Sequence, residues 1–241
     1  MIKVVCPSKG RWERVYSKML FKDLILIVPN NEVDKYKEYN PDNEIIGHDE
    51  IGIVNTRNFL IKKFDEFFQV DDDVLKVTKN YTMKNELCSN EEIVDFIEQD
   101  YFISKEIGAK LFGFIQITNP IRYWGLYIFT NNNYIDPSAC GFIKGHGLKY
   151  PKSIDEGEDY YIVCLNAYKN RYMLADWRIS FQSAKPFLNK GGCQGTRTSE
   201  SMLKNTKYLV DMFGSDVVKF KRRTSIKKNI KLGERTISIP I

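Results

Sequence analysis

The stretch Phe67-Phe68-Gln69-Val70-Asp71-Asp72-Asp73 constrains the fold of this chain more than any other. A short apolar run of β-prone residues ends abruptly in three consecutive carboxylates. Carboxylates that lie close together repel one another and cost stability unless a positive charge sits between them. Such a cluster at the end of a strand predicts a divalent cation, Mg²⁺ or Mn²⁺, with an anionic ligand such as a diphosphate. The alternative is a solvated acidic turn.

The residues before this stretch alternate between strand and helix patterns. Short apolar runs that end at Pro, Gly or charged residues predict strands, and the runs with helical spacing between them predict helices. The strands are expected at Ile2–Cys6, Asp23–Val28, Glu44–Gly47 and Glu66–Val70, and the helices at Trp12–Met19, Asn31–Tyr39 and Ile51–Phe64. This alternation is typical of an α/β fold with a single, mostly parallel sheet flanked by helices.

Two polar segments follow predicted strands of this sheet. Pro7-Ser8-Lys9-Gly10-Arg11 comes directly after the first strand, and Asp71–Asp73 comes after the fourth. Ligands bind to open α/β sheets at the carboxyl ends of the strands. We therefore expect the hydroxyl and cationic donors of the first segment to share a site with the aspartates.

The second half of the chain has a less regular pattern. Further helices are expected at Asn90–Asp100, Ser104–Lys110, Gly157–Tyr168 and Ser199–Phe213, the last capped by Thr198 or Ser199, and further strands at Leu111–Ile117, Tyr123–Phe129, Cys140–Ile143 and Tyr172–Ile179. A glycine-rich segment, Lys190–Thr198, precedes the last helix and contains Arg197.

Composition excludes several classes of protein. Hydrophobic residues make up 43% of the 241-residue chain, enough for a sizeable core, and no apolar run reaches the roughly 20 residues that span a bilayer. The five cysteines are scattered without a Cys-x-x-Cys pair, and there are only two histidines, so a zinc finger or ribbon is not expected. The first residues enter a strand pattern without a signal peptide, which predicts a soluble, cytoplasmic protein with reduced thiols.

The net charge of +5 is concentrated at the end of the chain. Residues 219–241 carry +7 and residues 1–218 therefore carry −2; the basic residues of the tail are Lys219, Lys221, Arg222, Arg223, Lys227, Lys228, Lys231 and Arg235. We expect a domain over 1–218, divided near residue 75 into two halves, and a basic segment over 219–241. A basic segment on a nearly neutral body indicates a polyanionic partner, DNA or RNA, or else a solubilising tail.

The order of these motifs resembles the GT-A fold glycosyltransferases. The motifs are Val4–Arg11, Asn55-Thr56-Arg57-Asn58, Val70–Asp73 and Gly157-Glu158-Asp159. The chain is similar to the glycosyltransferase family two enzymes, and in particular to the bacteriophage TET-associated glycosyltransferases, which put sugars on hydroxymethylated pyrimidines in DNA. The resemblance implies a metal-dependent hexosyl- or pentosyltransferase with a nucleotide-sugar donor such as a UDP-sugar, Mn²⁺ or Mg²⁺ as cofactor, and phage DNA in the host cytoplasm as acceptor.

The resemblance also implies a role for each matching residue. The loop that holds the nucleotide is matched by Pro7, Ser8, Lys9 and Arg11, and the helix that fixes the donor is matched by Arg57 and Asn58. The metal-binding Asp-x-Asp pair is matched by Asp71 and Asp73, and Asp71 or Asp72 would contact ribose or water. The catalytic base is matched by Asp159, with Glu158 beside it. Many GT-A enzymes use a late histidine as a further metal ligand, whereas this chain has none after His146. Water, His146 or another donor would complete the coordination.

The chemistry of glycosyl transfer gives these residue types a physical reason. Negative charge builds on the diphosphate leaving group, and a divalent cation offsets it; Arg197 on its glycine-rich loop would add to that stabilisation. A hydroxyl acceptor needs a carboxylate base within hydrogen-bond reach, which Asp159 would supply. An acceptor base extruded from DNA would stack on aromatic side chains, for which the candidates are Tyr123, Trp124, Tyr127, Tyr134, Tyr160 and Tyr161.

Each of these roles has a plainer alternative. Arg197 also suits a surface turn, Asp159 suits an acidic helix start, and the aromatics suit ordinary packing. At the level of the whole protein, three other functions stay open from sequence: a glycosyltransferase with a glycan, lipid or protein acceptor, a nucleotidyltransferase, and a non-catalytic nucleic-acid-binding protein. The last leaves Asp71–Asp73 unexplained.

Overall fold

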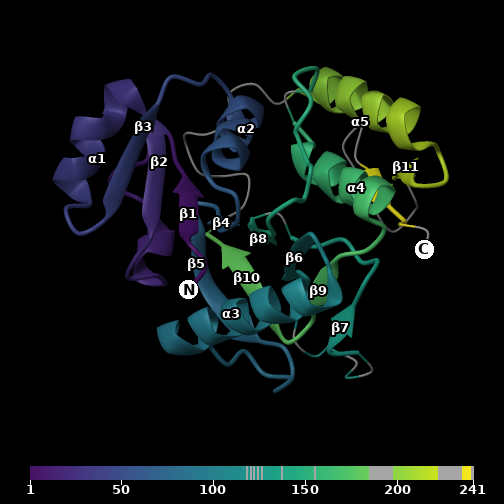
Figure 1. Ribbon diagram of the computed structural model, residues 1–241, viewed down its shortest axis with the longest axis horizontal. Helices are drawn as coiled ribbons and strands as arrows, with labels where there is room; N and C mark the ends of the chain where they lie inside the picture. Colours follow the sequence, from purple (N-terminus) through teal and green to yellow (C-terminus); the bar gives the residue numbers. More distant parts are fainter. Residues whose placement is uncertain are drawn as a thin grey trace.

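A computed structural model describes residues 1–117, 119, 121, 123, 125, 127–136, 138–154, 156–184, 198–221 and 235–239. Eight strands form the main sheet in the order β3-β2-β1-β4-β8-β6-β9-β7 (Figure 1). Their bounds are β1 Val4–Pro7, β2 Ile25–Pro29, β3 Glu44–His48, β4 Phe67–Val70, β6 Leu111–Phe114, β7 Phe129–Thr130, β8 Ala139–Phe142 and β9 Leu174–Asp176. β3, β2, β1 and β4 are parallel, as are β6 and β9, whereas β8 and β7 run antiparallel to their neighbours. The predicted mixed, mostly parallel α/β sheet is confirmed.

Helices cover both faces of the sheet. Their bounds are α1 Val33–Tyr39, α2 Ile53–Lys63, α3 Asn90–Ile107, α4 Glu158–Asn170 and α5 Ser199–Phe213. Successive residues of a strand point to opposite faces. Phe67 accordingly packs in the cluster that contains residues of α2, α4 and α5, and Phe68 packs with residues of α1 and α3. Each strand thus contributes to two cores, which explains why β4 is wholly buried.

Two small antiparallel pairs complete the described structure. β5, Val74–Lys79, pairs with β10, Ile179–Ser183, and β11, Val218–Phe220, pairs with β12, Arg235–Ile237. The second pair folds part of the basic segment back beside α4 and α5 (Figure 1). None of the helices in the described part of the chain is long and apolar enough to cross a membrane.

Two elements differ from those that the sequence predicts. The helix predicted over Trp12–Met19 is only a single 3₁₀ turn at Tyr16–Met19, because Tyr16 donates its backbone N–H to the Asp72 carbonyl at 2.8 Å. Among the described residues of the strand predicted over Tyr123–Phe129, only Phe129 is in a strand, where it begins β7. Gly125 has φ +67°, a backbone conformation that favours glycine and interrupts an extended run.

Three other elements differ in extent. The helices predicted at Asn90–Asp100 and Ser104–Lys110 are one helix, α3, which starts at a Ser89 capping box and ends at Gly108. The strand predicted over Tyr172–Ile179 is two strands, β9 and β10. β5 was not predicted, since its buried apolar residues Val74 and Val77 are three apart, a spacing that fits a helix as well as a strand.

Candidate active site

The two polar segments that follow β1 and β4 lie side by side. Val5 of β1 pairs in parallel with Gln69 of β4, so the carboxyl ends of both strands reach the same edge of the sheet. Ser8 is buried there, and its hydroxyl donates to Oδ2 of Asp72 at 2.5 Å. The predicted meeting of the first loop with the aspartates is therefore present in the structure.

Asp72 is used within this first loop. Besides Ser8, its carboxylate accepts from Nη1 of Arg11 at 2.5 Å, and its side chain is only 6% exposed. Tyr36 of α1 contacts the Ser8 hydroxyl at 2.7 Å and accepts from the Arg11 backbone N–H at 3.2 Å. Burial raises the pKa of Asp72, and Arg11 opposes that rise. Asp72 thus fixes the loop, and its predicted contact with ribose or water stays a prediction.

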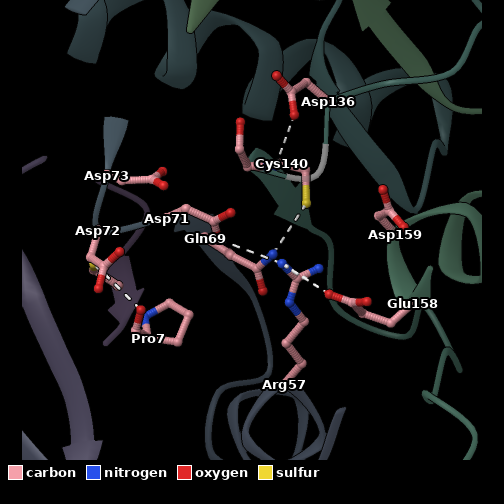
Figure 2. Close-up of polar contacts among 12 residues, drawn as sticks. Pro7, Arg57, Gln69, Asp71, Asp72, Asp73, Asp136, Cys140, Glu158 and Asp159 are labelled. Atoms are coloured by element: carbon pink, nitrogen blue, oxygen red, sulfur yellow. Dashed lines mark hydrogen bonds and ion pairs between the residues drawn. The ribbon is translucent and has the colours of Figure 1, made fainter. Parts of the chain in front are cut away.

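Asp71 and Asp73 remain accessible on either side of it. Their side chains are 33% and 21% exposed, and Figure 2 shows both carboxylates directed away from Pro7. Their backbones are held from two directions: Asp71 donates its N–H to Ser138 O at 2.8 Å, and Ala184 donates to Asp73 O at 2.7 Å. The two aspartates predicted to bind metal are rigidly placed and can reach a ligand.

Arg57 of α2 lies between the two sides of the site. Its Nη2 is 3.5 Å from Asp71 and 3.6 Å from Glu158, and the residue is only 4% exposed (Figure 2). Its Nε and Nη1 have no hydrogen-bond partner among the described residues. A buried guanidinium with unused donors can hold an anionic group that enters the site.

Glu158 and Asp159 form the first turn of α4. Glu158 is buried against Arg57, whereas Asp159 is half-buried and accepts a hydrogen bond at Oδ2 from the Tyr134 hydroxyl at 3.0 Å. Burial and the nearby Asp159 carboxylate raise the pKa of Tyr134, so this hydroxyl keeps its proton and donates. Asp159 is therefore held in one orientation at the mouth of the site.

Asp136 is a further carboxylate in the site. It is 9% exposed, one oxygen accepts from the Ser138 backbone N–H at 3.0 Å, and Oδ2 has no partner among the described residues. Figure 2 shows it on the same side as Asp159, opposite Asp73. Burial raises its pKa, and the neighbouring Asp159 carboxylate raises it further.

Carboxylates outnumber cationic side chains among the described residues of the site. Arg11 and Arg57 face the whole set, which consists of Asp71, Asp72, Asp73, Asp136, Glu158 and Asp159. Burial together with the neighbouring carboxylates raises the pKa of Asp71 to about 7, although Arg57 opposes the rise. This surplus of negative charge is what a bound cation would relieve.

A family model describing TET-associated glycosyltransferases matches residues 2–192. The chain belongs to this family. No curated protein matches the chain. The protein is therefore a glycosyltransferase. The match contains every site residue described so far and ends before α5, so α5, β11 and β12 lie beyond the matched region.

The donor set of this TET-associated glycosyltransferase fits a divalent cation. Asp71 and Asp73 offer hard oxygen ligands, and Oδ2 of Asp136, across the site from Asp73, has no partner among the described residues (Figure 2). No group of three or more acidic, histidine or cysteine side chains among the described residues is arranged to hold a metal ion. The protein would therefore supply one or two ligands, and the substrate diphosphate and water would complete the shell, as is usual for Mg²⁺.

The remaining predicted residues have different placements. Pro7 ends β1 with its ring buried, Lys9 is exposed, and Arg197 lies outside the described residues. Both ends of the Asn58 amide bond to the Tyr150 backbone, at 3.0 and 2.9 Å. The roles of these residues in donor binding stay predictions, and Asn58 in this structure positions the chain around Tyr150.

His146, the alternative metal ligand, is packed away from the aspartates. Its Nδ1 accepts from the Leu148 backbone N–H at 2.9 Å and its ring contacts Phe142. Burial lowers its pKa. His146 therefore has a structural role in the glycosyltransferase.

Sequence reasoning missed Asp136 and the function of Tyr134. Both come from the irregular segment Asn131–Asp136, where no strand or helix pattern points to a site. Tyr123 and Tyr127 line a cavity of about 860 Å³ together with Asn131–Asn133, the three residues that precede Tyr134 in the sequence. Tyr161 instead packs against Tyr208 and Phe213, and Trp124 lies outside the described residues.

Proposed function

We propose that this glycosyltransferase is metal-dependent and moves a sugar from a nucleotide-diphosphate sugar, such as a UDP-sugar, to a hydroxyl acceptor. The observation that carries the proposal is the pairing of two accessible aspartates, Asp71 and Asp73, with a surplus of buried carboxylate around them. Such a site favours a divalent cation and the diphosphate that accompanies it.

Donor binding would involve the segments that follow the carboxyl ends of β1 and β4. Asp71 and Asp73 would hold Mn²⁺ or Mg²⁺, which when bound offsets the charge that develops on the diphosphate leaving group. The ordered loop around Ser8 and Arg11 would receive the nucleotide, and the unused donors of Arg57 would meet a donor oxygen.

Asp159 would act as the general base of the transfer reaction. It is more exposed than Glu158, which is engaged with Arg57, and its carboxylate is oriented by Tyr134. The acceptor hydroxyl would give its proton to Asp159 as it attacks the anomeric carbon, and the bond from that carbon to the diphosphate oxygen would break.

The acceptor in this proposal is a 5-hydroxymethylpyrimidine, most simply hydroxymethylcytosine, in phage DNA in the host cytoplasm. Family membership, the basic segment 219–241 and the cavity lined by Tyr123 and Tyr127 support it. A base taken out of the helix needs an aromatic pocket with hydrogen-bonding groups, which Tyr123, Tyr127 and Asn131–Asn133 would offer. A glycan, lipid or protein acceptor is the alternative.

A calorimetric titration with a panel of nucleotide-sugars tests the donor and metal assignments together. We expect one donor to bind in the presence of Mn²⁺ and to lose binding in chelator or in Asp73→Asn. Glu86→Gln, which removes a surface carboxylate paired with Lys79 and not with any site residue, is the matched control and should bind normally. Metal-independent donor binding would overturn the metal assignment.

A further inference from the structure

We propose that Arg235 positions the candidate base Asp159 from the other end of the chain, through Tyr160 and Tyr134. The inference rests on the proposed function only in that Asp159 is taken as the base. Arg235 begins β12, beyond the region that the family model matches. The contact of Arg235 with α4, which we call the brace, therefore comes from the C-terminal part of the chain.

Arg235 is a buried cation packed on an aromatic ring. It is 9% exposed, its guanidinium carbon lies 4.9 Å from the centre of the Tyr160 ring, and Nη1 donates to Thr206 of α5 at 2.9 Å. A desolvated cation over an aromatic face is held more strongly than one in water. The contact therefore ties β12 to both α4 and α5.

The start of α4 is shaped around this guanidinium. Gly157, the residue before the helix, has φ +79°, and a Cβ at this position would overlap Nη2 and Cζ of Arg235. Only glycine combines that backbone conformation with room for the arginine. Arg235 thus lies directly beneath the turn that presents Glu158 and Asp159.

A stacked pair of tyrosines connects the guanidinium to the base. The rings of Tyr160 and Tyr134 are 5.0 Å apart and 23° from parallel, and the Tyr134 hydroxyl donates to Asp159 at 3.0 Å. Stacking fixes the plane of the Tyr134 ring, and the ring fixes where its hydroxyl points. Each link from Arg235 to the Asp159 carboxylate is therefore a direct contact.

The expected consequence is a loss of turnover without a loss of donor binding. A catalytic group displaced by about 1 Å can cost 10²-fold in rate, and the Tyr134 path controls the orientation of the base and not the metal side of the site. We expect Arg235→Met to lower kcat about 10- to 100-fold while the KM for the nucleotide-sugar stays within twofold. Arg235→Lys retains a cation over Tyr160 and should recover part of the loss.

The test is a double-mutant cycle with Tyr134→Phe, which removes the hydrogen bond to Asp159 and keeps the ring. If Arg235 acts through Tyr134, Arg235→Met added to Tyr134→Phe should lower kcat by less than threefold further. Independent, multiplying effects would overturn the inference, as would a wild-type kcat in Arg235→Met. Lys207→Met on α5, an exposed charge beside Thr206, is the matched control for charge and should leave kcat unchanged.

Two further variants keep the outcome decisive. Tyr160→Leu removes the ring between Arg235 and Tyr134 and leaves the bond from Arg235 to Thr206 available. It tests whether the contacts position Asp159 if Arg235→Met fails to fold. An unchanged kcat in Tyr160→Leu counts against the inference. Asp159→Asn separates the two claims. If Asp159→Asn retains full turnover, the proposed base is wrong, and if only Asp159→Asn lowers kcat, the base stands and the brace does not.

Discussion

At the scale of single residues, three consecutive aspartates have different surroundings. Asp72 is enclosed by Ser8 and Arg11, whereas Asp71 and Asp73 keep a face open. Substitutions at neighbouring positions should therefore act on different properties, on stability at Asp72 and on catalysis at Asp73. The same residue type in the same turn provides its own control.

Asp73→Ala should abolish transfer and leave the fold intact. Its carboxylate is predicted to bind the metal. Removing one negative charge from the cluster also lowers the repulsion among the carboxylates in the metal-free protein. The melting temperature in chelator should therefore hold or rise, while the stabilisation by Mn²⁺ should shrink. Thermal melts with and without Mn²⁺, next to an activity assay, check both; wild-type turnover would remove Asp73 from the metal site.

Asp72→Ala should instead destabilise the protein. The substitution leaves the Arg11 guanidinium, 12% exposed, without its closest carboxylate and leaves the Ser8 hydroxyl without an acceptor. Breaking a buried ion pair on one side costs about 3–5 kcal/mol, and the incomplete burial of Arg11 brings the expected loss to about 2–3 kcal/mol. Urea denaturation measures it, and an unchanged unfolding midpoint would contradict the structural role of Asp72.

At the scale of elements, the junction of α3 with β9 and β10 contains two buried carboxylates. Asp100 and Asp176 are fully buried, and Nη2 of Arg178 contacts both, at 3.1 and 2.8 Å. Burial, and then the proximity of Asp176, raises the pKa of Asp100 well above its ordinary value. A group with a raised folded-state pKa stabilises fully at acid pH, and that contribution is lost as pH rises through the folded-state pKa.

Asp100→Asn should therefore remove a pH dependence. The amide keeps the shape of the protonated acid, so the melting temperature of the variant relative to wild type should increase as pH rises from about 4 towards 8. Asp95→Asn, on the same helix and exposed, is the control and should show no such trend. A constant or reversed difference would show that Asp100 is not the titrating group.

Elements with strong local signals were predictable, and elements set by distant partners were not. Ser89 and Glu92 cap α3, and Thr198 caps α5. These local contacts fix both helix starts, which were predicted within a residue. β5 and the 3₁₀ turn at Tyr16–Met19 depend on β10 and on the Asp72 carbonyl, which are far away in the sequence. Asp136 escaped notice for the same reason, because burial and not its sequence context places it in the site.

At the scale of the whole molecule, the basic segment 219–241 has two parts. Residues 235–239 pack through Arg235 of β12 and through Ile239, which is buried beyond the strand. The basic residues Arg222, Arg223, Lys227, Lys228 and Lys231 lie outside the described residues. Truncating the chain after Phe220 would remove both parts, including the brace on α4. Neutralising the lysines alone separates binding of DNA from packing.

Lys227→Gln, Lys228→Gln and Lys231→Gln together should weaken DNA binding and flatten its salt dependence. Each lost phosphate contact changes the slope of log affinity against log salt by about 0.9 on duplex DNA, so the change should lie between about 1 and 3. Donor binding should stay as in wild type. Fluorescence anisotropy over a salt series measures the slope, and an unchanged slope would favour a glycan, lipid or protein acceptor.

The most direct test of the proposed function is nucleoside mass spectrometry of hydroxymethylcytosine-containing DNA after incubation with the enzyme, Mn²⁺ and a panel of nucleotide-sugars. We expect one donor to add the mass of one sugar to the hydroxymethylated nucleoside. The product should disappear in chelator and in Asp73→Ala, and fall about 10²–10⁴-fold in rate in Asp159→Asn. Transfer that continues in chelator and in both variants would contradict the proposed site, and the absence of a product with any donor would contradict the proposed acceptor.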